Sequence, residues 1–137
     1  MVDVEINWIN GLSFEGRNSK GNSVIMDVLD SENRMKGIGP MELVLISAGG
    51  CTAMDVISIL EKSKQKIKNF KVKVSGDRFS EHPKVYKKIL IEYIISGDEI
   101  SYDVVKKAVD LSKDKYCSVS IMLSKSVEIE HKITIQA

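Results

Sequence analysis

Alternating hydrophobic and polar residues mark the first part of the chain as strands. Between residues 2 and 8, the apolar side chains of Val2, Val4, Ile6 and Trp8 alternate with polar ones, which is the period of a half-buried strand. Asn10-Gly11 is typical of a turn. We therefore expect a short second strand to pair back on the first, and a third strand to follow it. The expected strands and connections are, in order, strand 12–15, connection 16–22, strand 24–29 and loop 30–39.

A long apolar segment comes next and predicts a helix. Pro40 suits the first turn of a helix, where its missing N–H would have had no partner, and nearly every turn from there to about Lys66 is apolar. The most apolar part, 41–60, approaches the length of a membrane span, but it contains charged residues and the Gly49-Gly50 pair. That composition favours a helix inside a protein. A helix that is apolar on all sides must be covered by other elements.

The remaining sequence predicts short elements arranged in blocks. Apolar and polar residues alternate in three further segments, which are predicted strands: 70–74, 89–95 and 127–135. Two helices are predicted before the last strand, one from the N-cap Ser101 to about Lys115 and one over 117–123. Strands and helices in blocks indicate an α+β fold and argue against a doubly wound sheet. Because no repeat or linker divides the sequence, we expect one domain over residues 1–137.

Composition and charge narrow the range of partners and compartments. With 20 basic and 19 acidic residues the net charge is +1, which gives no electrostatic reason to expect nucleic acid as a partner. The start of the chain lacks the basic flank and apolar core of a signal peptide. We therefore expect a cytoplasmic protein, whose two cysteines stay reduced and form no structural disulfide.

The two cysteines are the residues with the clearest chemistry. Cys51 follows Gly49-Gly50, and the lack of side chains there lets another segment or a small ligand approach the thiol. Cys117 stands at the start of a short predicted helix, where free N–H groups favour a thiolate. A peroxidatic cysteine needs a second thiol to trap its sulfenic acid. Both a redox pair and two thiols that pack as small hydrophobic groups fit these observations.

Metal binding is not expected from the sequence. The cysteines and the two histidines, His82 and His131, show no ligand spacing of the kind that zinc sites use. His131 falls on the apolar side of the last predicted strand, which indicates a core histidine with a hydrogen-bond partner. His82 precedes Pro83 in a polar segment and is expected to be exposed.

Two blocks of sequence resemble a known family. Pro40-Met41-Glu42-Leu43, followed by Ala48-Gly49-Gly50-Cys51, resembles the central helix of the OsmC/Ohr family of organic hydroperoxide reductases and osmotically induced proteins. In that family, a proline opens the helix eleven positions before the reactive cysteine, as Pro40 does here. Tyr116-Cys117-Ser118-Val119-Ser120 resembles the second cysteine block, usually Cys-Pro-Val, with Ser118 replacing the proline. The predicted order of elements also matches that of the family. The residues of the two cysteine motifs, Gly-Gly-Cys and Cys-Ser-Val, are most similar to those of the YhfA-like branch.

The resemblance implies a specific activity and assembly. It implies a thiol-dependent peroxidase that reduces organic hydroperoxides or H₂O₂ in oxidative stress defence, without a metal or organic cofactor. Cys51 would be the peroxidatic cysteine, and Cys117 would resolve its sulfenic acid as a disulfide. A dithiol reductant, such as a lipoylated protein, would then open this bond. The implied fold has antiparallel sheets around a buried central helix in an intertwined homodimer, with the active sites at the dimer interface.

The sequence departs from the family pattern beside the proline. Peroxidatic members carry a glutamate there, paired with an arginine that activates the thiolate, but this position is Met41 and the carboxylate is on Glu42. One step along a helix turns a side chain by about 100°, so the carboxylate of Glu42 points in a different direction from that of a glutamate at position 41. Arg34 corresponds to the arginine of the OsmC branch and Arg17 to that of the Ohr branch, and both remain candidates. The departure favours an alternative function, a non-enzymatic protein that binds or senses a small apolar or thiol-reactive ligand at the dimer interface.

Overall fold

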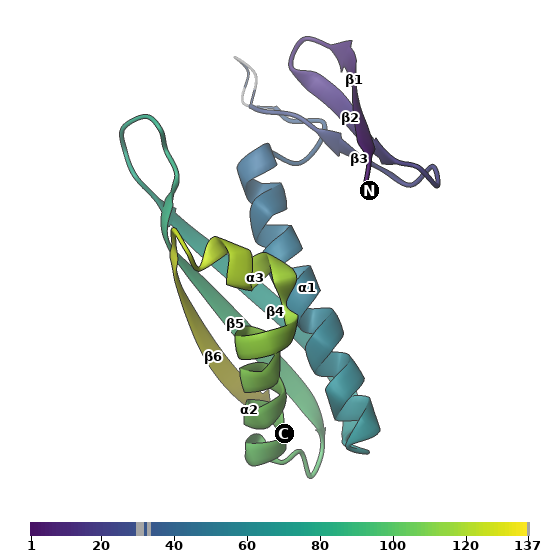
Figure 1. The fold of residues 1–137 in the computed structure, drawn as a ribbon, viewed down its shortest axis with the longest axis vertical. Coiled ribbons are helices and arrows are strands. Elements are labelled where there is room, and N and C mark those ends of the chain that lie inside the picture. Colours follow the sequence, from purple (N-terminus) through teal and green to yellow (C-terminus); the bar gives the residue numbers. More distant parts are fainter. Residues whose placement is uncertain (30–31, 33, 137) are drawn as a thin grey trace. The chain divides into compact units, whose positions relative to one another are not determined.

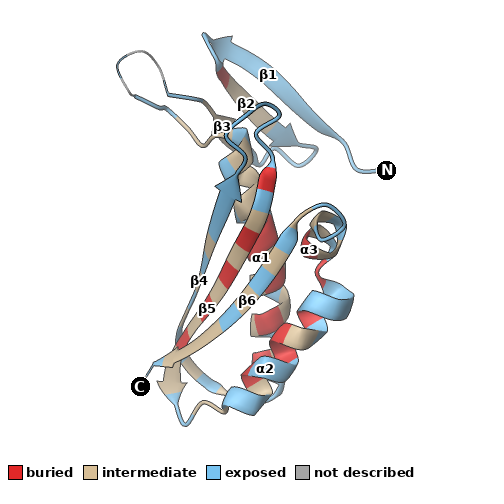
Figure 2. Ribbon diagram, turned by 90° about the vertical axis from the view of Figure 1, so that its left-hand side faces the viewer, coloured by how far each residue is buried: buried red, intermediate tan, exposed pale blue. Residues whose placement is uncertain are grey.

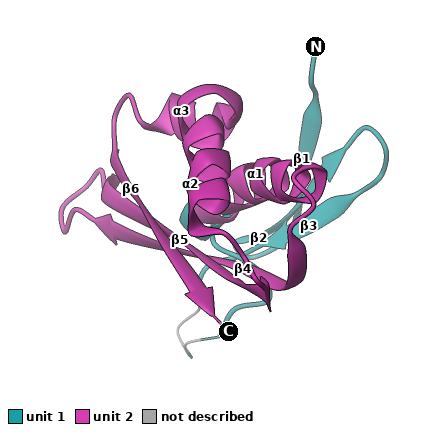
Figure 3. Cartoon of the chain, turned by 90° about the horizontal axis from the view of Figure 1, so that it is seen from below, with its two compact units in different colours: residues 1–44 teal, residues 45–137 magenta. Residues whose placement is uncertain are grey.

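The chain forms two compact units in a computed structural model that describes residues 1–29, 32 and 34–136. Unit 1 comprises residues 1–44 and unit 2 comprises residues 45–137 (Figure 3). Helix α1 (Pro40–Lys62) begins in unit 1 and continues in unit 2. The expectation of one OsmC-like domain over residues 1–137 stays a prediction.

Unit 1 is built on an antiparallel sheet in the order β1-β2-β3 (Figure 1). Its strands are β1 (Val4–Asn10), β2 (Ser13–Asn18) and β3 (Ser23–Met26). Gly11 takes a positive φ of 49° in the first turn, a conformation that glycine adopts without steric penalty. The three predicted strands are confirmed, but β2 reaches Asn18, within the segment predicted as a connection. The reason is that Val4 of β1 pairs with Asn18, and backbone pairing does not require apolar side chains.

The carboxylate of Asp27 accepts the hydrogen bonds that hold the segment following β3. The hydroxyl of Ser13 donates to Asp27 over 2.8 Å, and the backbone N–H groups of Lys36 and Val28 donate over 3.0 and 2.8 Å. These bonds, the one from Ser13 first, lower the pKa of the Asp27 carboxyl group. Together with the bridge between Met26 and Ile38, they hold the chain that leads into helix α1.

Unit 2 contains a second sheet in the order β4-β5-β6. Its strands are β4 (Lys66–Arg78), β5 (Tyr86–Asp98) and β6 (Glu128–Gln136). Between β5 and β6 lie α2 (Tyr102–Leu111), the π-helix η1 (Ser112–Tyr116) and α3 (Ser118–Leu123). The predicted α+β class is confirmed. The second sheet differs from the prediction of antiparallel sheets in one respect, because β6 runs parallel to β5. A parallel pair needs a crossover connection, and the intervening helices provide it.

The helices of unit 2 cover one face of this sheet (Figure 2). Alternate residues of β5 point toward them and are buried, as the period of a strand requires. These are Ile89, Ile91, Tyr93 and Ile95. Helix α1 supplies a stripe at every fourth position, consisting of Ala48, Thr52, Val56 and Leu60, and α2 supplies Val105, Ala108 and Val109. This layer is the core of unit 2, and Cys117 is buried in it.

Helix α1 is less covered than its sequence predicts. It begins at Pro40 as expected and ends at Lys62 rather than near Lys66, since Lys64 adopts a positive φ of 59° and β4 begins at Lys66. The helix is long and apolar enough to cross a membrane by length and composition, and 28% of its most apolar window is buried. Within the described part of the chain, one stripe is buried while Met54 is 74% exposed.

The glycine pair before Cys51 gives a prediction about packing. A Cβ atom on Gly49 would lie 2.6 Å from a methyl group of Val74 on β4, whereas a Cβ atom on Gly50 would meet no atom within 4 Å. Gly49→Ala should therefore overpack the contact and lower the free energy of unfolding by about 1–3 kcal/mol. Gly50→Ala is the matched control and should be neutral or raise stability by up to about 1 kcal/mol, because alanine favours helices over glycine. Urea unfolding measures both. Equal losses in the two variants would contradict the packing role of Gly49.

Candidate active site

The two cysteines lie together in unit 2. Cys51 is on helix α1 and is half-buried, while Cys117 is the N-cap of α3 and is fully buried. Both thiols are free, and Cys51 lies near enough to Cys117 to raise the pKa of the Cys117 thiol. Two residues far apart in the sequence are therefore brought near each other in unit 2.

The backbone around Cys117 is unusual and fixes the position of its thiol. The π-helix η1 widens the turn before Cys117, and the Cys117 N–H donates to the carbonyl oxygen of Ser112 over 2.7 Å. The backbone N–H of Ser120 donates to the sulfur over 3.4 Å, which confirms that Cys117 caps the short helix. The helix predicted to about Lys115 is found, but its last part differs in type, because α2 ends at Leu111 and Lys115 lies in the π-helix.

The expectation that the start of the short helix favours a thiolate at Cys117 is wrong, because burial outweighs the N–H groups and keeps the proton on the sulfur. Burial raises the pKa of the Cys117 thiol above the ordinary value, and the neighbouring Cys51 adds to this effect, while the hydrogen bonds from Ser120 oppose it. At neutral pH, Cys117 is thus a protonated thiol shielded from water. Cys51 is the thiol of the pair that has access to solvent.

A chain of polar side chains lies beside the thiols inside the core. Thr52, the residue after Cys51, contacts the hydroxyl of Tyr93 at 2.9 Å and that of Ser112 at 2.8 Å. Ser112 donates to Asp55 over 2.9 Å, and the Tyr93 hydroxyl lies 2.9 Å from Nδ1 of His131. Burial raises the pKa of Tyr93 to about 12, so its hydroxyl stays protonated at neutral pH.

Sequence reasoning anticipated only one member of this chain. His131 has a hydrogen-bond partner, as its place on the last strand indicates. Thr52, Ser112 and Tyr93 were not singled out. The available signal was the presence of Thr52 and Asp55 inside an otherwise apolar helix segment, since a buried hydroxyl needs a partner.

The other three predicted site residues belong to unit 1, where each has a local partner. Arg17 forms an ion pair with Glu15 at 3.0 Å, and Arg34 forms one with Glu32 at 3.0 Å. Glu42 is exposed, and its carboxylate accepts the N–H of Gly39 over 2.9 Å. This bond closes the first turn of α1 in the manner of a capping box.

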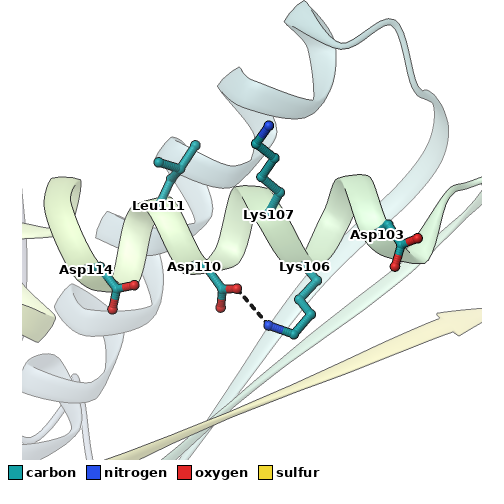
Figure 4. A pocket seen from close by; sticks show the side chains of 6 residues that line it. All are labelled: Asp103, Lys106, Lys107, Asp110, Leu111 and Asp114. Carbon is teal, nitrogen blue, oxygen red and sulfur yellow. Dashed lines mark hydrogen bonds and ion pairs between the residues drawn. The ribbon is translucent and has the colours of Figure 1, made fainter.

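Other parts of the described chain offer less chemistry. No group of three or more His, Cys, Asp or Glu side chains that could hold a metal ion occurs among residues 1–29, 32 and 34–136. A hollow of about 320 Å³ on α2 and η1 is lined by six residues between Asp103 and Asp114, and Lys106 pairs there with Asp110 at 2.7 Å (Figure 4). Because its lining comes from a single continuous segment, it does not converge on a ligand as binding pockets do.

Fold and cysteine geometry together define an α+β protein with a paired-thiol site, and the chain belongs to the OsmC-like protein family, which matches residues 31–132. The chain is 38% identical to Protein YhfA of Escherichia coli K12, over 99% of both chains. A solved hypothetical protein from Aquifex aeolicus is 32% identical with a TM-score of 0.87, covering 99% of this chain and 96% of that one. An OsmC-like protein from Mycoplasma pneumoniae shares the fold at 17% identity and a TM-score of 0.84, over 100% and 98% of the chains.

Solved structures that are named organic hydroperoxide resistance proteins share the same fold. They come from Legionella pneumophila, Elizabethkingia anophelis and Bacillus subtilis. Their TM-scores are 0.70, 0.69 and 0.65, at identities of 10%, 12% and 11%, with coverage of 96% or more of each chain.

The unequal environments of the two thiols predict an order of alkylation. With iodoacetamide at pH 8, Cys51 should be modified at least about tenfold faster than Cys117, because Cys117 is buried and its raised pKa makes its thiolate scarce. The alkylation rate at Cys117 should keep rising as the pH is increased beyond the usual pKa range of thiols. Peptide mapping by mass spectrometry measures both sites. Unfolding in urea is the control and should make the two rates similar. Equal rates in the folded protein would contradict this description of Cys117.

Proposed function

We propose that the protein is a cytoplasmic thiol-dependent peroxidase that reduces organic hydroperoxides or H₂O₂ by a two-cysteine mechanism. The observation that supports this most directly is the proximity of two free thiols of unequal exposure, Cys51 and Cys117. Membership of the OsmC-like family, in a fold shared with organic hydroperoxide resistance proteins, supports the same reaction and a role in oxidative stress.

The first step uses the more accessible thiol. The thiolate of Cys51 attacks one oxygen of the hydroperoxide, so that an S–O bond forms and the O–O bond breaks. The leaving alkoxide takes a proton and departs as an alcohol, or as water from H₂O₂, and Cys51 becomes a sulfenic acid. The sulfur is thereby oxidised by two electrons and the peroxide is reduced by two.

The second step uses Cys117, whose position near Cys51 suits it, and it must lose its proton as it reacts. Its sulfur attacks the sulfur of the sulfenic acid, an S–S bond forms, the S–O bond breaks, and the Cys117 proton leaves with the hydroxyl group as water. Burial protects Cys117 from reacting with peroxide directly. A dithiol reductant, such as a lipoylated protein, would return two electrons by thiol–disulfide exchange. No metal or organic cofactor takes part in this scheme.

Activation of Cys51 requires a nearby cation in this proposal. Arg17 and Arg34 are the candidates, with Glu42 as a carboxylate that would orient one of them. A cation lowers the pKa of an adjacent thiol, so replacing the activating arginine by methionine should slow alkylation of Cys51 at neutral pH. The same replacement of the other arginine should leave that rate unchanged.

A second copy of the chain is the partner that this proposal requires. Unit 1 exposes the apolar side chains of Val4, Ile6 and Trp8 on β1, and helix α1 exposes Met54. Exposed apolar surface of this kind marks an interface. The proposed assembly is an intertwined homodimer in which the partner covers α1 and bounds the active site.

A non-enzymatic function is favoured by one different observation. Unit 1 contains an apolar cavity of about 430 Å³, whose lining includes Val4, Ile6, Val24 and Met26. Such a cavity could hold a small apolar ligand, and Met41 stands where peroxidatic relatives are expected to carry glutamate. In this alternative, the thiols would not be consumed by peroxide.

The cysteine variants test the reaction directly. One equivalent of cumene hydroperoxide should convert the wild type to a Cys51–Cys117 disulfide, seen by mass spectrometry as the loss of two hydrogens and of both free thiols. Cys51→Ser should abolish peroxide consumption. Cys117→Ser should allow one turnover and then leave Cys51 as sulfenic or sulfinic acid, because no second thiol traps it. If both thiols of the wild type survive the peroxide, the ligand-binding function replaces the proposed one.

The proposed dimer is tested by its mass in solution. Light scattering at micromolar concentration should give twice the mass of one chain, since the exposed face of α1 is too apolar to remain in water. Met54→Lys places a charge on that face and should weaken the association, whereas Lys107→Glu on the exposed face of α2 should not. A wild-type protein that is monomeric at this concentration rules the dimer out.

A further inference from the structure

Five side chains of unit 2 form one continuous chain of hydrogen bonds through the core. It runs from Asp55 through Ser112, Thr52 and Tyr93 to His131, and its four contacts measure 2.9, 2.8, 2.9 and 2.9 Å. The residues come from four different elements: α1, η1, β5 and β6. Thr52 and Ser112 are fully buried, as is Tyr93.

The number of protons available fixes the direction of every bond. Each hydroxyl group has one proton to donate, and Ser112 donates its proton to the Asp55 carboxylate. Thr52 must therefore donate to Ser112, and Tyr93 must donate to Thr52. The fourth contact, between Tyr93 and His131, then needs a proton from the histidine, and the only atom that can supply it is Nδ1. A neutral His131 is consequently the Nδ1–H tautomer, with Nε2 as an acceptor.

The surroundings of His131 keep the ring neutral at pH 7. Burial lowers the pKa of His131 below its usual value, and the positive charge of Lys113 adds to this effect, while Asp110 and Asp114 oppose it. The ring lines a cavity of about 630 Å³ between α2 and β6. The other charged side chains around this cavity are Lys106, Glu130 and Lys132.

The chain connects the two segments that carry the thiols. Thr52 directly follows Cys51 on α1, and Ser112 binds Thr52 through its hydroxyl while its carbonyl oxygen accepts the N–H of Cys117. We infer that Thr52, Ser112 and Tyr93 are positioning residues, which hold Cys117 against Cys51 for disulfide formation and fix His131 in the Nδ1–H tautomer. The role in disulfide formation rests on the proposed function, whereas the tautomer of His131 does not.

The tautomer is tested by nitrogen NMR of the full-length protein labelled with ¹⁵N-histidine. The chain has two histidines, so in the His82→Gln variant all histidine signals come from His131. At pH 7.5, His131 should show a protonated Nδ1 and an unprotonated Nε2. Tyr93→Phe removes the acceptor of the Nδ1–H bond and should shift the population toward the Nε2–H tautomer. An Nε2–H tautomer in the protein with Tyr93 intact overturns the inferred direction of the chain.

The positioning role is tested at Thr52. Thr52→Val keeps the shape of the side chain but removes its hydroxyl. It should slow formation of the Cys51–Cys117 disulfide about tenfold, because the loss of roughly one hydrogen bond that aligns the two thiols corresponds to a change of about that size. Thr52→Ser retains the hydroxyl and should restore the wild-type rate. The oxidant is diamide, which joins paired thiols without a peroxide step, and the reaction is followed by acid quenching and mass spectrometry of the remaining thiols.

The outcomes separate this inference from the proposed function. If Thr52→Val forms the disulfide at the wild-type rate with diamide, the positioning role is wrong even if peroxide is consumed. If the wild type ignores peroxide but Thr52→Val is slow with diamide and Thr52→Ser is not, the peroxidase function fails and the positioning role stands. Circular dichroism checks that the valine variant folds, and Tyr93→Phe, which breaks the next bond of the chain, takes its place if it does not. In that variant, a wild-type rate with diamide likewise overturns the role.

Discussion

The close contact between helix α1 and the sheet of unit 2 is the constraint on which the rest of the site depends. Gly49 has no side chain, so the helix backbone can approach Val74 of β4. At that separation, Thr52 reaches the hydroxyl of Tyr93 on β5. A larger residue at position 49 would move the helix outward and lengthen this bond. Gly49, two residues before Cys51, is thus a packing residue that sets the position of the helix carrying the Cys51 thiol.

The two cysteines differ in exposure. Cys51 lies on a flank of α1 between the buried stripe and the exposed Met54, as a turn of about 100° per residue requires. Cys117 lies on the inner side, where the N–H of Ser120 binds its sulfur and burial holds its proton. A reaction that begins at an accessible thiol and ends at a protected one needs this difference, and two equally exposed thiols would both be open to oxidation.

Local sequence signals predicted the elements well, and contacts between distant segments less well. Ser101 caps α2 as expected, since its side chain accepts the N–H of Val104, and the pairing of the cysteines followed from a family resemblance. The parallel direction of β6 could not be read from its own alternation, because alternation is the same in parallel and antiparallel strands. The π-helix before Cys117 begins at Ser112, whose hydroxyl contacts residues of α1 that are distant in the sequence. Tyr93 resembles the other buried positions of β5 in the sequence, and only its contact with Thr52 distinguishes it.

Helix α1 carries more apolar side chains than its own chain buries, and the hydrogen bonds of its polar side chains indicate whether it spans a membrane or packs within a protein. A membrane span would leave Thr52 and Asp55 without partners in lipid, but both are hydrogen-bonded through Ser112 to the other elements of unit 2. The helix is therefore a packed element of a protein, and the apolar surface that its own chain leaves open calls for protein contact as well. In the homodimer we propose, that contact would lie beside Cys51, on the flank that faces away from the buried stripe. Access of a hydroperoxide to the thiol would then be set by the second copy, which makes association a condition of the reaction rather than only of stability.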